Sequence, residues 1–550
     1  MLFIKIINQI SSVGYLCETT KKVSRNKYRK NRFGNAAREF AGIFILLLAT
    51  MMVFSTCKKS DEQPYQPIND PALPADEDAF HVTVNGNSSG TGSLDSPWDL
   101  QTALDHPPSI QPGATIYIHG GVYRGAFIAA LNGTAEAPII VRARPGGTVI
   151  IDNRESTSEA SGAIEFWGSY TWIIGLTVTN SNANHQTPHN GADGVFFMGK
   201  ENKLLHCIIH DNEGNGIGFW SSSVNSEVSG CIIYHNGFIG PTRGHGHGLY
   251  VQNNNPATKS ITDNVIFNSF GKGMQIYGTG VIVRNVLVEG NTIFNTGLGA
   301  RATPEQGVYA GGERPVSNIL VNNNAFYFSP KSYETAATKF GYAEDPRNGY
   351  AEFHNNYCVD AFLHITKFWD RISTSNNTYI AKSAAKRIVV GYDVYERVDI
   401  REYDNNTYYR GEIGENGANG FTHHPLSAIQ AYGQELNSAY HNALPVQNHI
   451  ILRPSRYETG RAFVTIYNWE GKTSVAVDVS SVLNAGDKYA LYDVTNLSTG
   501  PVLQSTYSGG TIEVPMNLIT VDKPLNITTG LDRFKNTAPD FGVFMLLRTW

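Results

Sequence analysis

The chain has 550 residues and a formal net charge of −5. A negative net charge does not indicate the basic surface that nucleic-acid binding requires, so nucleic-acid binding is excluded from the expected functions. The 54 glycines and 11% aromatic residues are typical of a turn-rich β protein whose aromatic side chains can stack on sugars. The length predicts one long repetitive domain and one smaller domain.

Residues 1–57 are expected to form an export signal. A basic stretch over residues 21–38 precedes an apolar run over residues 41–54, whose length is closer to a signal sequence than to a membrane span. The run ends at Cys57, and the polar, Pro-rich residues 58–78 suit a tether. This pattern resembles the lipoprotein anchors of Bacteroidota-like bacteria. The resemblance implies lipidation of Cys57 and an outer-membrane or cell-surface location; the alternative is an uncleaved signal anchor.

Residues 80–118 are expected to cap the repetitive domain. The segments over residues 80–86, 96–104 and 112–118 are expected to supply a short strand and an amphipathic helix that lie over the first coil. The end of a stack of strands exposes apolar surface and unpaired edges, so a cap is physically required.

Eight stretches with the same short β pattern fall into one register. They begin at Cys207, Cys231, Asn264, Asn291, Asn324, Asn356, Asn377 and Asn406. The first steps are 24, 33, 27 and 33 residues, and a period of 20 to 50 residues with short apolar segments predicts a solenoid. We therefore expect an all-β fold with a parallel β-helix over residues 79–424. Cys207 and Cys231 should be stacked, buried, reduced thiols, and the asparagines should form a ladder of amides.

Residues of about 80 to 410 resemble the right-handed parallel β-helix superfamily of surface and secreted proteins that act on polysaccharides. That superfamily includes pectate and alginate lyases, mannuronan epimerases and several glycoside hydrolases. The resemblance implies a right-handed coil and a polysaccharide substrate, but one coil pattern hosts many chemistries.

A second strand in each repeat predicts an outward-facing strip. These strands begin at Gly194, Gly216, Gly248, Gly273 and Gly307. The residues just before them are Asp193, Asn215, His247, Lys272 and Gln306. The residues two after them are Phe196, Gly218, Tyr250, Gln275 and Tyr309, and Trp220 and Tyr277 stand four after two of them. Because neighbouring strands lie about 4.8 Å apart, five coils give a strip of roughly 20 Å, enough for several sugar units.

The strip carries residues suited to β-elimination from a uronic acid. His247 or Tyr250 could act as base, Tyr250 could return the proton, and Lys272 or Arg243 could hold the carboxylate. The expected substrate-binding residues are Arg243, His245, Trp220, Gln275, Tyr277 and Tyr309. A polysaccharide lyase is the first functional hypothesis.

Two other functions stay open. A glycoside hydrolase needs two carboxylates about 5 to 9 Å apart, and Asp193 with Glu213 is the best pair. A glycan-binding or adhesion protein would use the strip only to bind, with His247 and Lys272 as ordinary coil residues. His245 and His247 lack an evident third metal ligand, so no metal site is predicted, and a requirement for Ca²⁺ stays open.

The pattern changes after residue 409. Residues 426–440 have helical spacing, and residues 425–449 are expected to connect the solenoid to an antiparallel β-sandwich over residues 450–550, where apolar residues alternate between turns. The sandwich carries no catalytic constellation. We expect a monomer.

Overall fold

The computed structural model describes residues 73–549, apart from residues 156–159, 187–190, 301–304, 330–337, 343–346, 367, 384, 386, 394–397 and 418–419. Cys57, the predicted signal and most of the predicted tether lie outside these residues. Within the described ranges, no helix is both long and apolar enough to cross a membrane.

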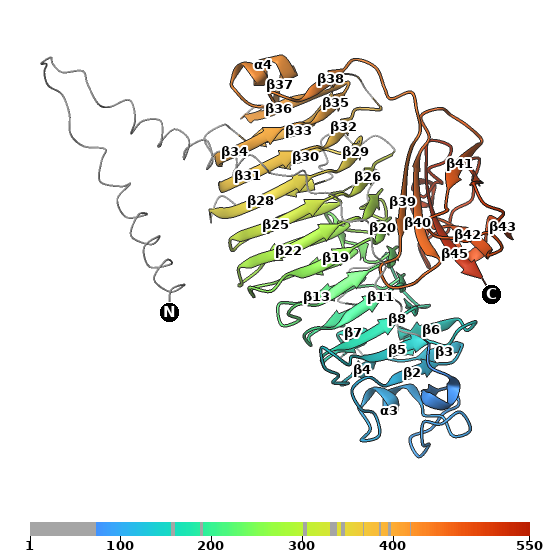
Figure 1. Ribbon diagram of the computed structural model, residues 1–550. Coiled ribbons are helices and arrows are strands. Elements are labelled where there is room, and N and C mark those ends of the chain that lie inside the picture. The colour runs from blue at the N-terminus through green and yellow to red at the C-terminus, as the bar shows by residue number, and fades with distance from the viewer. Residues whose placement is uncertain are drawn as a thin grey trace, which may run out of the picture. The chain divides into compact units, whose positions relative to one another are not determined.

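Most of the described chain winds into a parallel β-solenoid with three 12-stranded sheets (Figure 1). Sheet 1 contains β1 (Phe80–Val82), β2 (Thr115–Ile118), β5 (Ile139–Ala143), β8 (Thr171–Ile174), β11 (Lys203–Leu205), β14 (Glu227–Ser229), β19 (Lys259–Thr262), β22 (Val283–Glu289), β25 (Val316–Asn322), β28 (Asn348–His354), β31 (Trp369–Ser375) and β34 (Val398–Asp404).

Sheet 2 carries the candidate site. Its strands are β4 (Phe127–Ala129), β7 (Gly162–Phe166), β10 (Asp193–Phe197), β13 (Ile217–Phe219), β18 (Leu249–Val251), β21 (Met274–Gly278), β24 (Val308–Gly312), β27 (Thr338–Phe340), β30 (Leu363–Ile365), β33 (Arg387–Asp393), β36 (Gly411–Gly417) and β37 (Gly420–His424). All neighbours pair in parallel except β36 and β37, which are antiparallel.

Sheet 3 completes the coils. It contains β3 (Gly121–Arg124), β6 (Val149–Asp152), β9 (Thr177–Thr179), β12 (Ile208–His210), β15 (Ile232–Tyr234), β20 (Val265–Phe267), β23 (Thr292–Phe294), β26 (Ala325–Tyr327), β29 (Tyr357–Val359), β32 (Thr378–Ile380), β35 (Thr407–Tyr409) and β38 (Ala439–His441). Strand β38 pairs with β35, so the segment expected as a connector still contributes a strand to the solenoid. That segment also contains helix α4 (Leu426–Ala431).

The N-terminal cap consists of β1 and helix α3 (Leu100–Leu104). Strand β1 extends sheet 1 by pairing with β2. Helix α3 begins after Asp99, whose side chain accepts the main-chain N–H of Thr102 and so satisfies a free helical donor. Leu100 and Leu104 are buried against the first coils, which covers the apolar end of the solenoid.

The repeats stack as their spacing predicts. Cys207 and Cys231 are free, fully buried thiols in adjacent coils, because alternate residues of each strand point into the core. The asparagines form the expected ladder: each donates its side-chain amide to the next across Asn264, Asn291, Asn324, Asn356, Asn377 and Asn406 at 2.9 to 3.0 Å. The ladder satisfies buried polar groups at every coil corner.

The outer face of sheet 3 is covered by C-terminal strands. Rings of His210, Tyr234, Phe267 and Phe294 stack along four coils at 5.1, 5.0 and 4.7 Å between centroids. Phe541 meets Phe294 edge to face at 5.3 Å, which seals the stack beneath the C-terminal sheet. His210 is therefore a packed ring, as its position predicts.

The C-terminal strands form an antiparallel pair of sheets. The larger sheet orders β39 (His449–Pro454), β40 (Arg461–Tyr467), β45 (Phe541–Thr549), β42 (Lys488–Asp493) and β43 (Leu503–Thr506), and the smaller one pairs β41 (Ser474–Asp478) with β44 (Thr511–Pro515). Val464, Leu491 and Val514 belong to a core of their own between these sheets.

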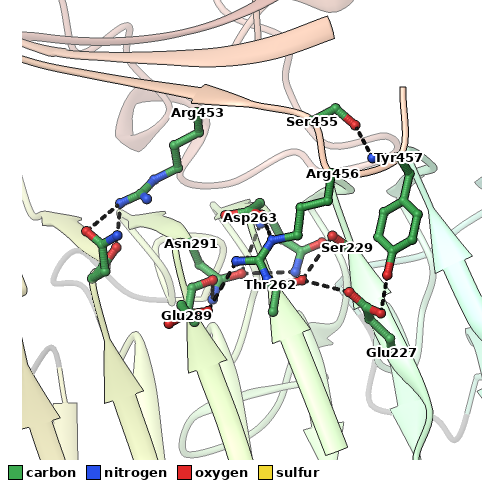
Figure 2. A network of polar contacts seen from close by, with 12 residues as sticks. Glu227, Ser229, Thr262, Asp263, Glu289, Asn291, Arg453, Ser455, Arg456 and Tyr457 are labelled. Atoms are coloured by element: carbon green, nitrogen blue, oxygen red, sulfur yellow. Dashed lines mark hydrogen bonds and ion pairs between the residues drawn. The ribbon is translucent and has the colours of Figure 1, made fainter. Parts of the chain in front are cut away.

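Ion pairs fix these sheets to sheet 1 (Figure 2). Arg456 bonds Asp263 at 2.6 Å and Glu289 at 3.1 Å, and the Tyr457 hydroxyl donates to Glu227 at 2.5 Å. The C-terminal strands therefore cover sheet 3 and part of sheet 1, whereas most of the candidate residues lie on sheet 2 or directly beside its strands.

Candidate functional site

The strand register brings the predicted outward residues of sheet 2 into columns. The central column runs Glu165, Phe196, Gly218, Tyr250, Gln275 and Tyr309 in neighbouring strands. We call the outward side chains on β7, β10, β13, β18, β21 and β24 the sheet-2 strip. The predicted column is confirmed from Phe196 onward, and Glu165 extends it by one coil.

Aromatic rings line the first part of the strip. Trp220 lies 5.2 Å from the ring of Tyr250 and 5.6 Å from Phe196, and all three side chains are partly exposed. Trp167 is 52% exposed one coil before Phe196. Such half-exposed rings offer flat apolar faces to a sugar without closing over them.

A second aromatic cluster follows along the strip, and the exposure of its side chains differs from the prediction. Tyr277, Tyr309 and Tyr342 lie 5.3 to 6.4 Å apart. Tyr309 is only 5% exposed, with the ammonium of Lys272 5.1 Å from its ring, and burial raises its pKa. Tyr277 and the 49% exposed Tyr342 are thus better placed than Tyr309 to contact a ligand, and Tyr342 was not predicted.

A hydrogen-bonded ladder runs along the edge of the strip. The main-chain and side-chain N–H groups of Asn215 donate to Asp193 Oδ1 at 2.7 and 3.0 Å. The main-chain N–H of His247 donates to Asn215 Oδ1 at 3.0 Å, and that of Lys272 donates to His247 Nδ1 at 2.9 Å. Each side chain therefore accepts a main-chain N–H of the next coil.

This ladder fixes the protonation of His247. Burial, followed by the charges of Lys272 and Arg243, holds the pKa of His247 well below its usual value, so the ring is neutral. Because Nδ1 accepts from Lys272, the proton of the neutral ring resides on Nε2. His247 is 6% exposed and presents a donor, which leaves no lone pair for the general-base role expected of it.

The carboxyl group of Asp193 occupies the space beside Gly218, which has no side chain. A Cβ atom at Gly218 would lie 2.2 Å from Asp193 Oδ2 and 2.7 Å from Trp220 Nε1, so only glycine leaves room for these groups. Burial raises the pKa of Asp193 to about 7, despite the opposing hydrogen bonds from Asn215. Asp193 can therefore carry a proton near neutral pH.

The remaining predicted residues make fewer contacts with the side chains of the sheet-2 strip. Glu213 accepts the main-chain N–H of Asn184 at 2.6 Å and makes no hydrogen bond with Asp193. Arg243 is exposed, and His245 stacks on Phe238 at 5.1 Å within the hairpin of β16 (Phe238–Ile239) and β17 (Gly244–His245). Gln275 is half-buried between Tyr250 and Tyr309 in the column. The rings of His247 and Tyr250 lie 6.3 Å apart, and Lys272 contacts His247 through its main-chain N–H.

No group of three or more His, Cys, Asp and Glu residues in the described part of the chain is arranged to hold a metal ion. Residues 80–327 match the family model described as the right-handed β-helix region of Pel9A-like proteins. Over these residues, which are fewer than half of the chain, the protein is similar to the Pel9A-like right-handed β-helix region.

Proteins similar to this chain include two curated proteins and one solved structure. Pectate lyase L of Thermoclostridium stercorarium is 23% identical over 355 residues, which cover 54% of this chain and 27% of that protein. Pectate lyase PEL9 of Emericella nidulans is 36% identical over 79 residues, or 14% of this chain and 18% of that protein. The chain therefore matches about a quarter or less of these two relatives. The crystal structure of pectate lyase Pel9A is 18% identical, with 54% of this chain and 78% of that chain covered and a TM-score of 0.37.

Two polar residues near the sheet-2 strip were not predicted from the sequence. Glu165 accepts Trp167 Nε1 at 2.7 Å and the main-chain N–H groups of Ser161 and Gly162 at 2.9 and 3.3 Å. It was missed because Ala163 stands where the later coils have the opening glycine.

The second missed residue is the fully buried Lys259. Its ammonium donates to the carbonyls of Trp220 and Gln252 at 2.5 and 2.8 Å, and burial lowers its pKa well below the usual value. Lys259 thereby joins the coil corners that follow β13 and β18 and positions the backbone of Trp220. No sequence signal distinguishes this lysine from a solvated one.

Proposed function

We propose that this protein is a polysaccharide lyase that cleaves uronic-acid-containing glycans by β-elimination on the sheet-2 strip. One observation carries the proposal: the ring of Tyr250 lies 5.2 Å from the half-exposed ring of Trp220 and 6.3 Å from the neutral ring of His247. The ammonium of Lys272, from the next coil, lies 5.1 Å from the ring of Tyr309. The relationship of the helix to proteins named pectate lyases supports the same class.

In the proposed reaction, substrate binding comes first. Rings of Trp220 and Tyr277 stack on sugar faces, and Lys272 attracts the carboxylate of the uronic acid. Nε2–H of His247 donates to the same carboxylate, whose charge grows as the proton on the adjacent carbon is removed. A donor that is already fixed by the ladder requires no reorganisation during this step.

Tyr250 then transfers the proton. The proposed step requires Tyr250 to act as a phenolate: its oxygen removes the proton from carbon 5, and the electrons of that bond form the double bond between carbons 4 and 5. The bond from carbon 4 to the glycosidic oxygen breaks, and that oxygen takes the proton from Tyr250. Tyr250 returns to its starting state, and the products are a new reducing end and an unsaturated uronic acid.

A substrate panel tests the proposal. Purified full-length protein is incubated with polygalacturonate, rhamnogalacturonan, alginate and a neutral galactan, while ultraviolet absorbance of unsaturated products and reducing ends are followed together. We expect the two signals to rise equally on at least one uronate polymer and neither to rise on galactan. Reducing ends without unsaturated products would contradict a lyase.

Hydrolysis is the second candidate, and the raised pKa of Asp193 favours it. A carboxyl group with a pKa of about 7 suits a general acid, and hydrolysis requires a second, ionised carboxylate nearby. Glu165 in the preceding coil of sheet 2 replaces Glu213 as the partner in this candidate. Asp193→Asn and Glu165→Gln should then each abolish release of reducing ends, whereas a lyase should retain most of its activity in Glu165→Gln.

A further inference from the structure

A long connection of the C-terminal domain reaches the corner of the solenoid that precedes β21. We call residues 518–536, which lie between β44 and β45, the C-terminal arm. At one end of the arm, Asp522 donates its main-chain N–H to the carbonyl of Thr495 at 2.8 Å. At the other end, the side-chain amide of Asn536 donates to Asp493 at 2.8 Å. Both ends are therefore fixed to the C-terminal sheets, and the residues between them contact the solenoid.

Polar contacts hold the arm to the solenoid turns that follow β9 and β12. The side-chain amide of Asn526 donates to the carbonyl of Ala183 at 2.9 Å. The main-chain N–H of Leu525 donates to Asp211 Oδ1 at 2.8 Å. The same carboxylate oxygen lies 3.1 Å from Nε2 of the fully buried His185. One carboxylate thus joins the arm to a buried ring of the solenoid.

An apolar cluster joins the arm to the corner before β21. Ile527 and Phe534 of the arm are buried with Phe270 of the corner, and Ile239 packs against the same cluster. The Phe270 ring also stacks on the ring of His185, with 4.6 Å between centroids. Because Phe270 is fully buried and Phe534 is 2% exposed, the arm covers apolar surface that water would otherwise reach.

This cluster supports the two segments that carry basic side chains beside the sheet-2 strip. Phe270 stands two residues before Lys272 in the same corner. Ile239 pairs with Gly244 in the hairpin of β16 and β17, next to Arg243. A Cβ atom at Gly244 would lie 1.8 Å from the carbonyl oxygen of Phe270, so the hairpin and the corner touch through their backbones.

The basic side chains of these segments lie close enough to affect one another. Burial, followed by the charges of Arg243 and Lys272, lowers the pKa of His245. Burial and then the charges of Lys272 and Arg243 lower the pKa of His247 as well. Like charges at such a short range repel, and the repulsion favours movement of a surface hairpin away from the strip. The apolar contacts with the arm oppose that movement.

We propose that the C-terminal arm completes the sheet-2 strip, with Ile527 and Phe534 as positioning residues for substrate binding. Through Phe270 and Ile239 they hold the hairpin and the Lys272 corner in the arrangement that binds an acidic polysaccharide. The inference rests on the proposed function of the strip. Since the arm acts on the basic side chains that bind carboxylates, its loss should weaken substrate binding and leave the catalytic step largely unchanged.

Limited trypsin digestion of the native, full-length protein tests the position of the hairpin. Cleavage after Arg243 should be about tenfold faster in Phe534→Ala, because release of the arm lets the hairpin open locally. Ile239→Ala changes a partly buried residue on the solenoid side of the contact and should have the same effect. Ile519→Ala is the matched control, since Ile519 lies on the arm and is 87% exposed. Cleavage after Arg284, at an exposed position of β22, reports overall unfolding and should stay at the wild-type rate.

Binding and kinetics on acidic oligosaccharides test whether this position matters to the strip. KM for oligogalacturonate should rise about tenfold in Phe534→Ala and in Ile239→Ala, with kcat within about twofold of wild type. The dissociation constant of trigalacturonate, measured by calorimetry, should rise by a similar factor. The calorimetric result does not depend on which reaction the strip performs.

The outcomes separate this inference from the proposed lyase. Faster cleavage after Arg243 together with weaker binding supports the positioning role, whether or not unsaturated products form. Wild-type cleavage after Arg243 in both variants overturns the inference, and so does faster cleavage with unchanged KM and unchanged binding; neither result affects the lyase. Equal acceleration after Arg243 and Arg284 in both variants shows a loss of overall stability and also overturns it. Failure of the proposed lyase is seen separately, as an absence of unsaturated products from wild type.

Discussion

The main-chain N–H of Lys272 donates to Nδ1 of His247 at 2.9 Å, so the ring that the sequence marks as a base is held as a donor. Asn215 performs the same acceptor role one coil earlier, where its side-chain oxygen receives the N–H of His247. An asparagine can therefore satisfy this position of the ladder, but it cannot place a donor where Nε2 lies.

His247→Asn separates the two roles of that ring. We expect the free energy of unfolding to stay within about 1 kcal/mol of wild type, because the amide oxygen can accept from Lys272. Turnover on a uronate polymer should fall by about a hundredfold, the scale for losing one donor to a developing negative charge. Urea denaturation and initial rates of unsaturated product measure the two effects. Unchanged turnover would show that His247 only accepts the hydrogen bond from Lys272 and does not contribute to catalysis.

Asp193 should make stability depend on pH. Its pKa is raised from 3.8 to about 7 in the folded protein, so between these values the folded state keeps a proton that the unfolded state releases. The resulting stabilisation is present below about pH 4 and is lost as pH rises to about 7. Three pKa units correspond to about 4 kcal/mol.

Asp193→Asn tests that dependence, since its amide oxygen can still accept from Asn215. Urea denaturation at several pH values should show a decline in wild-type stability across this window that is much smaller in the variant. Glu165→Gln serves as the control in the preceding coil. Parallel curves for wild type and Asp193→Asn would show that Asp193 is ionised throughout.

Lys272 should discriminate substrates by charge. Lys272→Met keeps an unbranched apolar side chain over Tyr309 and removes the cation 5.1 Å from that ring. We expect KM for oligogalacturonate to rise about tenfold, with little change in affinity for the methyl-esterified oligosaccharide, which has no carboxylate. Equal losses for both ligands would indicate a packing role instead.

The repeat spacing predicted the fold well because coil geometry leaves little freedom. Once Cys207 and Cys231 share an inward position, the period of two and the parallel pairing determine the facing of the following strands, and Tyr250 falls beside Gln275 as expected. The same argument predicted the ladder of asparagine side chains from Asn264 onward.

The details of the site depend on side-chain directions that spacing does not encode. The orientation of the His247 ring follows from a single hydrogen bond to the next coil, and Tyr309 is buried by neighbours that include Tyr342, which follows β27.

The predicted lipid anchor at Cys57 needs its own experiment. We propose that Cys57 is lipidated at the cell surface of a Gram-negative bacterium, and Cys57→Ala should then release the protein from the membrane fraction or leave its precursor unprocessed. Cys17→Ala is a matched control and should fractionate like wild type. Membrane association and processing that are the same in both variants would contradict lipidation.

The most direct test of the account is the product formed by wild type and by Tyr250→Phe on a uronate polymer that the wild type cleaves. The substitution keeps the ring beside Trp220 and removes only the oxygen that moves the proton. We predict unsaturated products from wild type and at least about a hundredfold slower turnover in the variant, with an unchanged unfolding midpoint. Full activity in Tyr250→Phe, or wild-type products that lack the double bond, would contradict β-elimination at this strip.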